Sequence, residues 1–430
     1  MTLNNGRPQK LRVHSKKNAD GRLFYVVAVC GIIPPRASQS LFFSRYFMTR
    51  RSKRFERRLA KRIKRRKLFL EKYDNYANVC NRINLFEAAD LAKKNVLWKS
   101  SVQSWSIHQL LNTERLYRDM TDGRDIRKGF SKFTICERGK IRHISAVRFY
   151  ERIVQKALCK NVLYPVYTRS LVYDNGASQK GKGVIFSQNR LIKHLTRHFK
   201  KYGNNGYILL VDYKGYFENI DHPALKALYR KYFKDKRLLK LIDDLVDAYG
   251  DKGLGLGSET SQMHAIIFPN VIDHAIAECI GHGVFFGRYM DDSYIIAKDK
   301  KLLLKAIAVI KRFCEKLKIT LSPNKTKIVN LRNCFKYLKT VFHFTDKGKI
   351  IKKPYRRNIT RERRKVKKQI RLWRAGKIGT KELQQSFESW AGSMLRRNAR
   401  RTVWNMRRLF GKETKLWKKK RKQNLKLNAG

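Results

Sequence analysis

Two adjacent acidic residues stand in the middle of the stretch Val284-Phe-Phe-Gly-Arg-Tyr-Met-Asp-Asp-Ser-Tyr-Ile-Ile-Ala297. The apolar and aromatic residues on either side favour two β-strands, so the acids are predicted to lie at the tip of a hairpin. In a chain that is otherwise strongly basic, carboxylates held against apolar residues suit hard cations, which prefer oxygen ligands. Taken alone, the pair Asp291-Asp292 could equally be an acidic turn on the surface.

The composition indicates a globular protein with an extreme positive charge. The chain of 430 residues is 42% hydrophobic and 11% aromatic, which is enough for more than one packed core. It has 99 Lys and Arg residues against 33 Asp and Glu, a formal net charge of +66. Such a charge favours a polyanionic partner. Nucleic acid fits better than a membrane surface, because the basic residues are spread along the whole chain. Charge alone predicts binding without sequence preference that weakens steeply with salt.

The cysteines and the hydropathy pattern favour a cytoplasmic protein. The cysteines are scattered singly, without zinc-binding spacing, so we expect reduced thiols. No apolar run reaches the roughly 18 residues that a membrane span needs. The apolar segment 23–33 follows basic residues, as in a secretory signal, but it ends in two prolines and precedes a very basic chain. We therefore do not interpret it as a signal.

The chain divides into four predicted regions. Residues 1–47 show little periodicity and are expected to form a poorly defined extension, with the folded unit beginning near Met48. Residues 48–79 are expected to form a basic helical segment. Residues 80–350 alternate strand-like and helical patterns. Residues 351–430 become helical and basic, and are predicted to form a separate helical domain with a C-terminal tail.

The third region contains the clearest local patterns. Residues 133–144 are predicted to form a hairpin with a glycine turn, and residues 149–163 and 258–280 are predicted to be helices. The run Tyr207-Ile-Leu-Leu-Val211 is apolar throughout, as expected for a strand buried on both faces.

A third carboxylate follows this buried strand directly. Asp212 closes the strand, and if it lies beside Asp291 and Asp292 in one sheet, the three form a carboxylate cluster. Such a cluster can hold two divalent ions about 3.5–4 Å apart, which activate an attacking hydroxyl and stabilise the leaving oxygen of a phosphoryl transfer. The pattern therefore predicts a two-ion phosphoryl-transfer site.

The order of these motifs resembles that of reverse transcriptases, particularly the bacterial group of retron, group II intron, diversity-generating and defence-associated enzymes. The stretches similar to motifs A to E are Tyr207-Ile-Leu-Leu-Val-Asp-Tyr-Lys-Gly-Tyr-Phe-Glu-Asn-Ile-Asp-His222, Gly253-Leu-Gly-Leu-Gly-Ser-Glu-Thr-Ser-Gln262, Tyr289-Met-Asp-Asp292, Leu321-Ser-Pro-Asn-Lys-Thr-Lys-Ile328 and Phe335-Lys-Tyr-Leu-Lys-Thr-Val-Phe342. Upstream, Lys140-Ile-Arg142 and Glu151-Arg-Ile-Val-Gln-Lys-Ala-Leu158 resemble the fingers motifs.

The resemblance implies an α+β fold of the right-hand polymerase type. It would have fingers, a palm built on an antiparallel sheet flanked by helices, and a thumb in the basic helices from residue 351. The activity implied is RNA-directed DNA polymerisation, in which dNTPs are added to a primer 3′-hydroxyl with two Mg²⁺ ions, or Mn²⁺ as the alternative. The partners implied are an RNA template, a DNA or RNA primer and the cDNA product.

The resemblance also implies which residues bind the ions and select the sugar. Asp212 and Asp291 would bind both ions, Asp292 would assist, and the Tyr213 carbonyl would complete one coordination shell. Phe217 would be the aromatic gate that a ribose 2′-hydroxyl strikes, although an aromatic residue at this place could also be simple core.

The incoming nucleotide would be held by a second group of residues. Gln262 would line its pocket, while Lys140 and Arg142 would clamp the triphosphate, a task for which the guanidinium fork is suited. Lys325 would approach the leaving pyrophosphate. In a chain so rich in lysine, Lys140 and Lys325 could also be ordinary solvated side chains.

The primer and the template would be contacted further along the chain. Met290 and Leu338 would border the primer, although Lys339 stands where this motif commonly has glycine. The basic helix at 50–67 and the helical region 373–404 are either solvated faces or tracks along nucleic acid. Because the charge exceeds what one short duplex needs, we expect a dedicated structured RNA partner in a retroelement or an antiphage defence system.

Two other functions remain open from the sequence. An RNA-templated RNA polymerase would need similar carboxylates, and Phe217 argues against it. A maturase-like protein that only binds RNA would not need the three aspartates. The sequence leaves open the template, the mode of priming and the choice between mobility, diversification and defence.

Overall fold

The structure is a computed structural model that describes residues 13–17, 23–27, 50–137, 140–280 and 283–414. Most of the predicted extension 1–47, the predicted start at Met48 and the tail from 415 lie outside the described residues. The chain divides into two compact units. Unit 1 comprises Met1–Gly183, Val211–Ser293 and Leu304–Thr326, and unit 2 comprises Val184–Leu210, Tyr294–Leu303 and Lys327–Gly430.

Several helices of unit 1 begin at recognisable sequence signals. Side chains of Asn81, Asp235 and Ser258 accept hydrogen bonds from the first N–H groups of α2, α9 and α10, which have no partner inside their helices. The helices of this unit are α1 (Arg50–Tyr73), α2 (Arg82–Ala92), α3 (Ser100–Ile107), α4 (Gln109–Thr121), α5 (Phe149–Leu158), α6 (Tyr164–Ser170), α8 (His222–Tyr229), α9 (Lys236–Asp247), α10 (Glu259–Ile267) and α11 (Asn270–Cys279). Helix α12 (Lys300–Leu317) begins in unit 2 and ends in unit 1.

Two predicted helices are interrupted in the structure. The helix predicted over 149–163 is α5 followed by a π-helical turn, Cys159–Leu163, which leads directly into α6. The helix predicted over 258–280 was wrong as one element, because the chain forms α10 and α11 with Pro269 between them. Proline has no N–H to donate within a helix, which explains the break.

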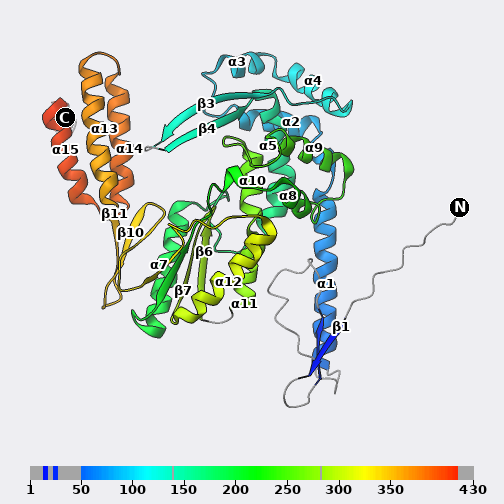
Figure 1. The fold of residues 1–430 in the computed structure, drawn as a ribbon. Helices are drawn as coiled ribbons and strands as arrows, with labels where there is room; N and C mark the ends of the chain where they lie inside the picture. Colours follow the sequence, from blue (N-terminus) through cyan, green and yellow to red (C-terminus); the bar gives the residue numbers. More distant parts are fainter. Residues whose placement is uncertain (1–12, 18–22, 28–49, 138–139, 281–282, 415–430) are drawn as a thin grey trace, which may run out of the picture. The chain divides into compact units, whose positions relative to one another are not determined.

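The predicted hairpin of unit 1 is confirmed and is longer than expected. Strand β3 (Phe130–Glu137) pairs antiparallel with β4 (Lys140–Val147), from Phe130 opposite Val147 to Glu137 opposite Lys140 (Figure 1). The turn residues 138 and 139 lie outside the described residues.

The carboxylates are positioned by a four-stranded sheet with the order β6-β7-β5-β8. Strand β5 (Tyr207–Val211) is the predicted buried strand, and it pairs antiparallel with β8 (Lys327–Asn330). Strands β6 (Phe285–Tyr289) and β7 (Asp292–Ala297) are neighbours joined by Met290 and Asp291. The prediction of two acids at a hairpin tip is therefore confirmed.

Unit 2 contains a second sheet, α7 (Val184–Tyr202) and a bundle of helices. The sheet has the order β11-β10-β9, with β9 (Phe335–Tyr337), β10 (Thr340–Phe344) and β11 (Ile350–Pro354). Residue 351, where the helical region was predicted to begin, lies in β11, because Ile351 pairs with His343 of β10. The first residues of that region are thus strand, and the helices begin at Arg356.

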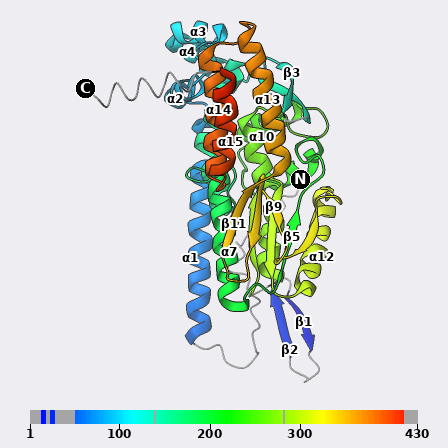
Figure 2. The ribbon, with the colours of Figure 1, turned by 90° about the vertical axis from the view of Figure 1, so that its left-hand side faces the viewer.

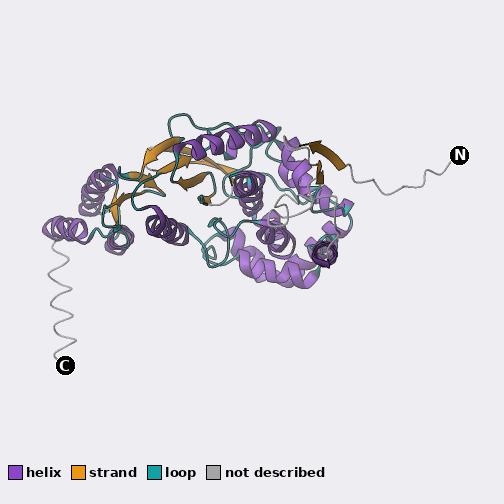
Figure 3. Ribbon diagram, turned by 90° about the horizontal axis from the view of Figure 1, so that it is seen from below, coloured by secondary structure: helices purple, strands orange, loops and turns teal. Residues whose placement is uncertain are grey.

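The C-terminal bundle consists of α13 (Arg356–Arg374), α14 (Thr380–Leu395) and α15 (Arg400–Thr414). The three helices lie side by side in Figures 1 and 2 and are seen nearly along their axes in Figure 3. Their apolar faces form one core of buried side chains, among them Val366, Ile370, Leu383, Phe387, Val403, Met406 and Phe410. Because the apolar residues face inward at helical spacing, the basic residues of these helices cover the outside.

The described part of the chain also bears on membrane-spanning helices and on the state of the cysteines. None of its helices combines the length and the apolar character needed to cross a lipid bilayer. Five of the cysteines are free thiols, namely Cys80, Cys136, Cys159, Cys314 and Cys334.

Candidate active site

The ammonium group of Lys325 bonds to Asp212 and is influenced by the charges of Asp291 and Asp292. The Lys325 Nζ donates to Oδ2 of Asp212 at 2.6 Å, and Asp212 as a whole residue is only 5% exposed. Burial alone would lower the pKa of Lys325. The hydrogen bond to Asp212 and the charges of Asp212, Asp291 and Asp292 outweigh burial, so the pKa lies above the usual lysine value. Lys325 therefore contacts one of the three acids and responds to the charge of the other two, while their clustering around metal ions stays a prediction.

The backbone of Asp212 is fixed by the segment that resembles motif D. Its carbonyl accepts from the N–H of Ser322 at 2.8 Å, and the Lys214 N–H donates to the Thr320 carbonyl at 2.8 Å. Tyr213 forms an isolated antiparallel bridge with Leu321 between these two bonds. The bridge does not use the Tyr213 carbonyl, so the group predicted to complete a coordination shell is not consumed by this pairing.

The turn between β6 and β7 has a strained conformation at Met290. Its φ is +55°, in the left-handed region that residues other than glycine rarely adopt. The Met290 carbonyl accepts from Nη1 of Arg288 at 3.0 Å. This bond helps to hold the turn, and with it Asp291, in a conformation that costs on the order of 1–3 kcal/mol.

Arg288 belongs to a fully buried ion pair that the sequence analysis missed. Its Nε lies 2.9 and 2.8 Å from the two carboxylate oxygens of Asp273 in α11, and its Nη2 donates to the Ile266 carbonyl of α10 at 2.8 Å. Burial alone would lower the pKa of Arg288, but the charge and hydrogen bonds of Asp273 raise it. The signal was present, because an arginine inside an apolar strand needs a buried acid as its partner.

The predicted sugar gate lies just beyond Asp212. Phe217 is half-buried and meets the Tyr216 ring edge-on, with ring centroids 5.8 Å apart. The Tyr216 hydroxyl donates to the Ala265 carbonyl of α10 at 2.6 Å, and the Phe217 carbonyl accepts from the Leu254 N–H at 2.7 Å. These bonds fix the ring beside the glycine-rich loop while leaving part of it exposed.

The glycine-rich loop leads into the helix that presents Gln262. Gly253 has φ +84°, and a Cβ there would lie 2.8 Å from the Glu218 carbonyl oxygen, so only glycine fits. Of the residues of α10, all of which the structure describes, Gln262 alone is exposed. The contact of Gln262 with a nucleotide stays a prediction.

The predicted triphosphate clamp lies on β4. Arg142 is exposed, and the side chain of Lys140 lies outside the described residues. Nearer the base of the hairpin, the Ser145 N–H donates to the Leu256 carbonyl at 3.3 Å, and a Cβ on Gly257 would lie 3.3 Å from Ile144 Cγ2. The hairpin and the glycine-rich loop are therefore in contact.

Unit 2 contains the turn predicted to border the primer. Leu338 and Lys339 join β9 to β10 with φ of +45° and +62°, so the turn forms without glycine. Gln188 donates to the Leu338 carbonyl at 3.2 Å and to Thr340 Oγ1 at 2.9 Å, and Arg397 Nε donates to the same Oγ1 at 2.9 Å. These bonds brace a turn that its sequence would disfavour.

Comparison with known proteins identifies the family. The family model described as reverse transcriptase (RNA-dependent DNA polymerase) matches residues 126–342, just over half of the chain. The chain belongs to the reverse transcriptase family. The family resemblance and the α+β polymerase fold are therefore confirmed, whereas the bacterial subgroup stays a prediction. A search of curated protein sequences found no match to this reverse transcriptase.

Solved structures of telomerases are similar to this reverse transcriptase. One is telomerase from Candida albicans with the TWJ fragment of telomeric RNA, at 13% identity and a TM-score of 0.41, covering 54% of this chain and 46% of that one. Another is apo telomerase from Candida tropicalis truncated from its C-terminal domain, at 14% identity and a TM-score of 0.40, covering 52% and 54%. This reverse transcriptase spans about half the length of these telomerase chains.

The donor atoms of this reverse transcriptase fit the divalent ions on which its family generally depends. Asp212, Asp291 and Asp292 offer carboxylate oxygens, the donors that Mg²⁺ prefers. Among the described residues, no group of three or more His, Cys, Asp or Glu side chains forms a ready metal site. The ammonium of Lys325 bonds to Asp212, so a positive charge already balances this carboxylate. The chemistry of the donor atoms fits the ions.

Proposed function

We propose that this protein is an RNA-directed DNA polymerase whose catalytic carboxylates are Asp212, Asp291 and Asp292. The observations that support the proposal are the bond of Lys325 to Asp212 and the effect of the Asp291 and Asp292 charges on its pKa, inside a chain segment that matches the family. Two Mg²⁺ ions held by these residues would activate the primer 3′-hydroxyl and stabilise the leaving oxygen. The Tyr213 carbonyl, unused by its bridge to Leu321, is a further oxygen ligand in this proposal.

The chain's own residues would orient the nucleotide. Gln262, exposed on α10, would line its pocket, and Lys140 and Arg142 would pair with the triphosphate oxygens through charge-assisted hydrogen bonds. Lys325 stays protonated because its pKa is raised, so it offers positive charge to the leaving pyrophosphate. Phe217, held by the Leu254 N–H and the Tyr216 ring, would exclude a 2′-hydroxyl.

The catalytic role of the carboxylates is tested with one double variant, in which both residues are replaced by isosteric amides. Asp291→Asn with Asp292→Asn keeps the size of both side chains while removing both charges. We expect primer extension on an RNA template to fall by at least a factor of about 10³, since electrostatic stabilisation of the transition state is lost. RNA affinity should stay within a few-fold, which controls for folding. Extension that survives the double change would overturn the proposal.

The sugar gate has its own test. Phe217→Ala removes the ring that a ribose would strike, so incorporation of rNTPs should rise relative to dNTPs. Phe217→Tyr keeps the ring and should keep the preference. A wild-type protein that incorporates rNTPs as readily as dNTPs would instead favour the RNA-templated RNA polymerase considered from the sequence.

We also infer that the template is a dedicated structured RNA, in a retroelement or an antiphage defence system. The net charge of +66 supports this inference, because neutralising it needs a large polyanion. Sequencing the RNA that co-purifies with the protein tests the inference. A single enriched, folded RNA species is expected, and generic cellular RNA in proportion to its abundance would contradict it.

A further inference from the structure

An exposed tryptophan on α15 is surrounded by arginines. Trp404 is 57% exposed, and arginines stand four and three residues before it and three and four residues after it. These are Arg400, Arg401, Arg407 and Arg408. Side chains three or four positions apart are neighbours on a helix, so this surface of α15 places the indole between two pairs of arginines, one on each side of it.

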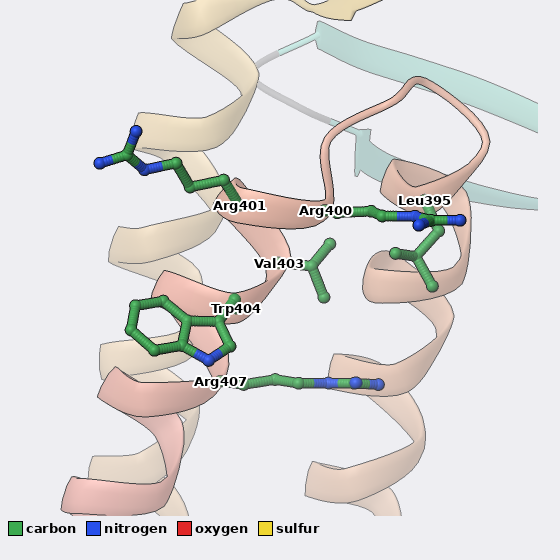
Figure 4. A pocket seen from close by; sticks show the side chains of 6 residues that line it. All are labelled: Leu395, Arg400, Arg401, Val403, Trp404 and Arg407. Carbon is green, nitrogen blue, oxygen red and sulfur yellow. The ribbon is translucent and has the colours of Figure 1, made fainter.

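This surface borders an open hollow beside α14 and α15. Its volume is about 460 Å³, and it is lined by Leu395, Arg400, Arg401, Val403, Trp404 and Arg407. Figure 4 shows Arg400 and Arg407 extending from α15 toward α14, whereas Arg401 and Trp404 lie on the other side of α15. Val403 is buried in the core and forms the floor. The volume lies within the roughly 300–1,000 Å³ of small-ligand sites.

The charge of the surface is only partly balanced by the protein. Arg407 pairs with Glu388 at 3.1 Å, and the Arg408 guanidinium lies 4.8 Å from the centre of the Trp404 ring. Within the described part of the chain, Arg400 and Arg401 have no acidic partner. The surface therefore offers cations for phosphate oxygens beside an aromatic face for a base.

Packing within the bundle does not explain Trp404. The core of α15 uses Val403, Met406 and Phe410, which are buried, and Trp404 is outside this set. The Trp404 ring contacts Arg408, and the residue stays 57% exposed, so the ring is available to a ligand. An aromatic ring among arginines is the combination by which proteins hold unpaired nucleotides.

We propose that this surface of the C-terminal bundle binds an unpaired nucleotide of an RNA strand. The base stacks on Trp404. The flanking phosphates pair with two arginines that are seven positions apart in the sequence, and a helix separates such positions by about 10 Å. RNA is the occupant because a polymerase of this kind leaves its product paired, whereas its template is unpaired before it is copied. The choice of RNA rests on the proposed function, but binding itself needs no polymerisation.

The experiment measures binding of the full chain to fluorescent oligouridine and to a blunt RNA duplex of equal charge. Because stacking contributes about 1–3 kcal/mol per base, Trp404→Ala should weaken oligouridine binding roughly 5- to 150-fold. Duplex binding should stay within twofold, since paired bases cannot stack on the ring. Trp404→Phe should retain most of the affinity. Trp98→Ala is the matched control, because Trp98 is 75% exposed beside Lys99 but lies in unit 1.

The contribution of the arginines is tested by measuring how RNA affinity depends on salt concentration. Arg401→Ala should reduce the slope of log affinity against log salt by about 0.7 for the single strand. Unchanged oligouridine binding in Trp404→Ala, or an equal loss for duplex and single strand, would overturn the proposal. So would binding of an acidic peptide that depends on Trp404 while RNA binding does not. The Asp291→Asn, Asp292→Asn variant should bind oligouridine normally, so failure of the catalytic proposal is distinguishable from failure of this one.

Discussion

Replacing Arg288 by methionine should lower the free energy of unfolding and slow primer extension, for two separable reasons. Methionine has a similar length but no guanidinium, so the bidentate bond to Asp273 and the bonds to the Ile266 and Met290 carbonyls are lost together. Removing one partner of a buried ion pair typically costs about 3–5 kcal/mol, because the other charge stays buried. Domains are stable by only about 5–15 kcal/mol, so the shift in denaturation should be large.

A double change separates stability from catalysis. Arg288→Met with Asp273→Leu removes both charges, and such exchanges are often neutral or stabilising. The Met290 carbonyl would still lack its charged donor. Hydrogen bonds to charged groups contribute about 1.5–3 kcal/mol, so loosening of the Asp291 turn should lower kcat roughly 10- to 150-fold. The Michaelis constant for dNTP should change little, because the residues proposed to contact the nucleotide are unchanged.

The assays are urea denaturation and steady-state primer extension on the same preparations. Arg82→Met is the matched control, because Arg82 also lies 2.6 Å from a carboxylate, that of Glu114, but on the surface. Exposed pairs contribute about 0–1 kcal/mol, so this variant should stay close to the wild type. If the double variant regains both stability and kcat, Arg288 is merely structural and the positioning role is refuted.

Three further predictions concern single side chains. Lys325→Ala removes the cation that competes for Asp212, so Mn²⁺ binding measured by electron paramagnetic resonance should tighten several-fold while kcat falls. Burial, aided by the charge of His222, lowers the pKa of His264 to about 3, so the unfolded chain binds a proton below pH 6.5 that the folded chain refuses. Stability should therefore fall as pH drops from 6.5 toward 3, by up to about 1.4 kcal/mol per unit, and His264→Leu should flatten this slope in urea titrations. Lys339→Gly relieves a positive φ and should stabilise the protein by about 1 kcal/mol, while weakening primer–template binding through the lost charge.

For each of these three predictions, a specific result would contradict the reasoning. Unchanged Mn²⁺ affinity in Lys325→Ala would mean that the lysine does not compete with the ion. A pH slope that persists in His264→Leu would assign the effect to other groups, such as His198, whose pKa burial also lowers. Lys339→Asn is the control for charge, because asparagine tolerates positive φ. If this variant binds primer–template as well as the wild type does, the charge has no role there.

Local patterns predicted the elements that present the site. The apolar run that ends at Asp212 is β5, and the residues around Asp291 form the expected turn between two strands. These predictions succeed because an apolar run that ends in an acidic residue is a local feature of the sequence. The break at Pro269 was equally local and should have been predicted from the missing N–H.

Contacts between distant segments could not be predicted in the same way. Nothing in the spacing pairs Arg288 with Asp273 in preference to another acid, because the choice depends on how α11 packs against β6. The partner of Lys325 likewise follows from the bridge between Tyr213 and Leu321, which brings motif D beside Asp212. Leu338 and Lys339 form a tight turn that sequence alone disfavours, because Gln188 and Arg397 stabilise it from elsewhere in unit 2.

The guanidinium of Arg288 joins two parts of the site that the motifs treat as separate. One of its nitrogens holds the Met290 carbonyl in the carboxylate turn, and another holds the Ile266 carbonyl in α10, the helix that presents Gln262. Since the group is planar and rigid, a movement of α10 is transmitted to the turn. In the function that we propose, recognition of the nucleotide by Gln262 is thereby coupled to the alignment of Asp291, and changes at Gln262 and Arg288 should combine non-additively.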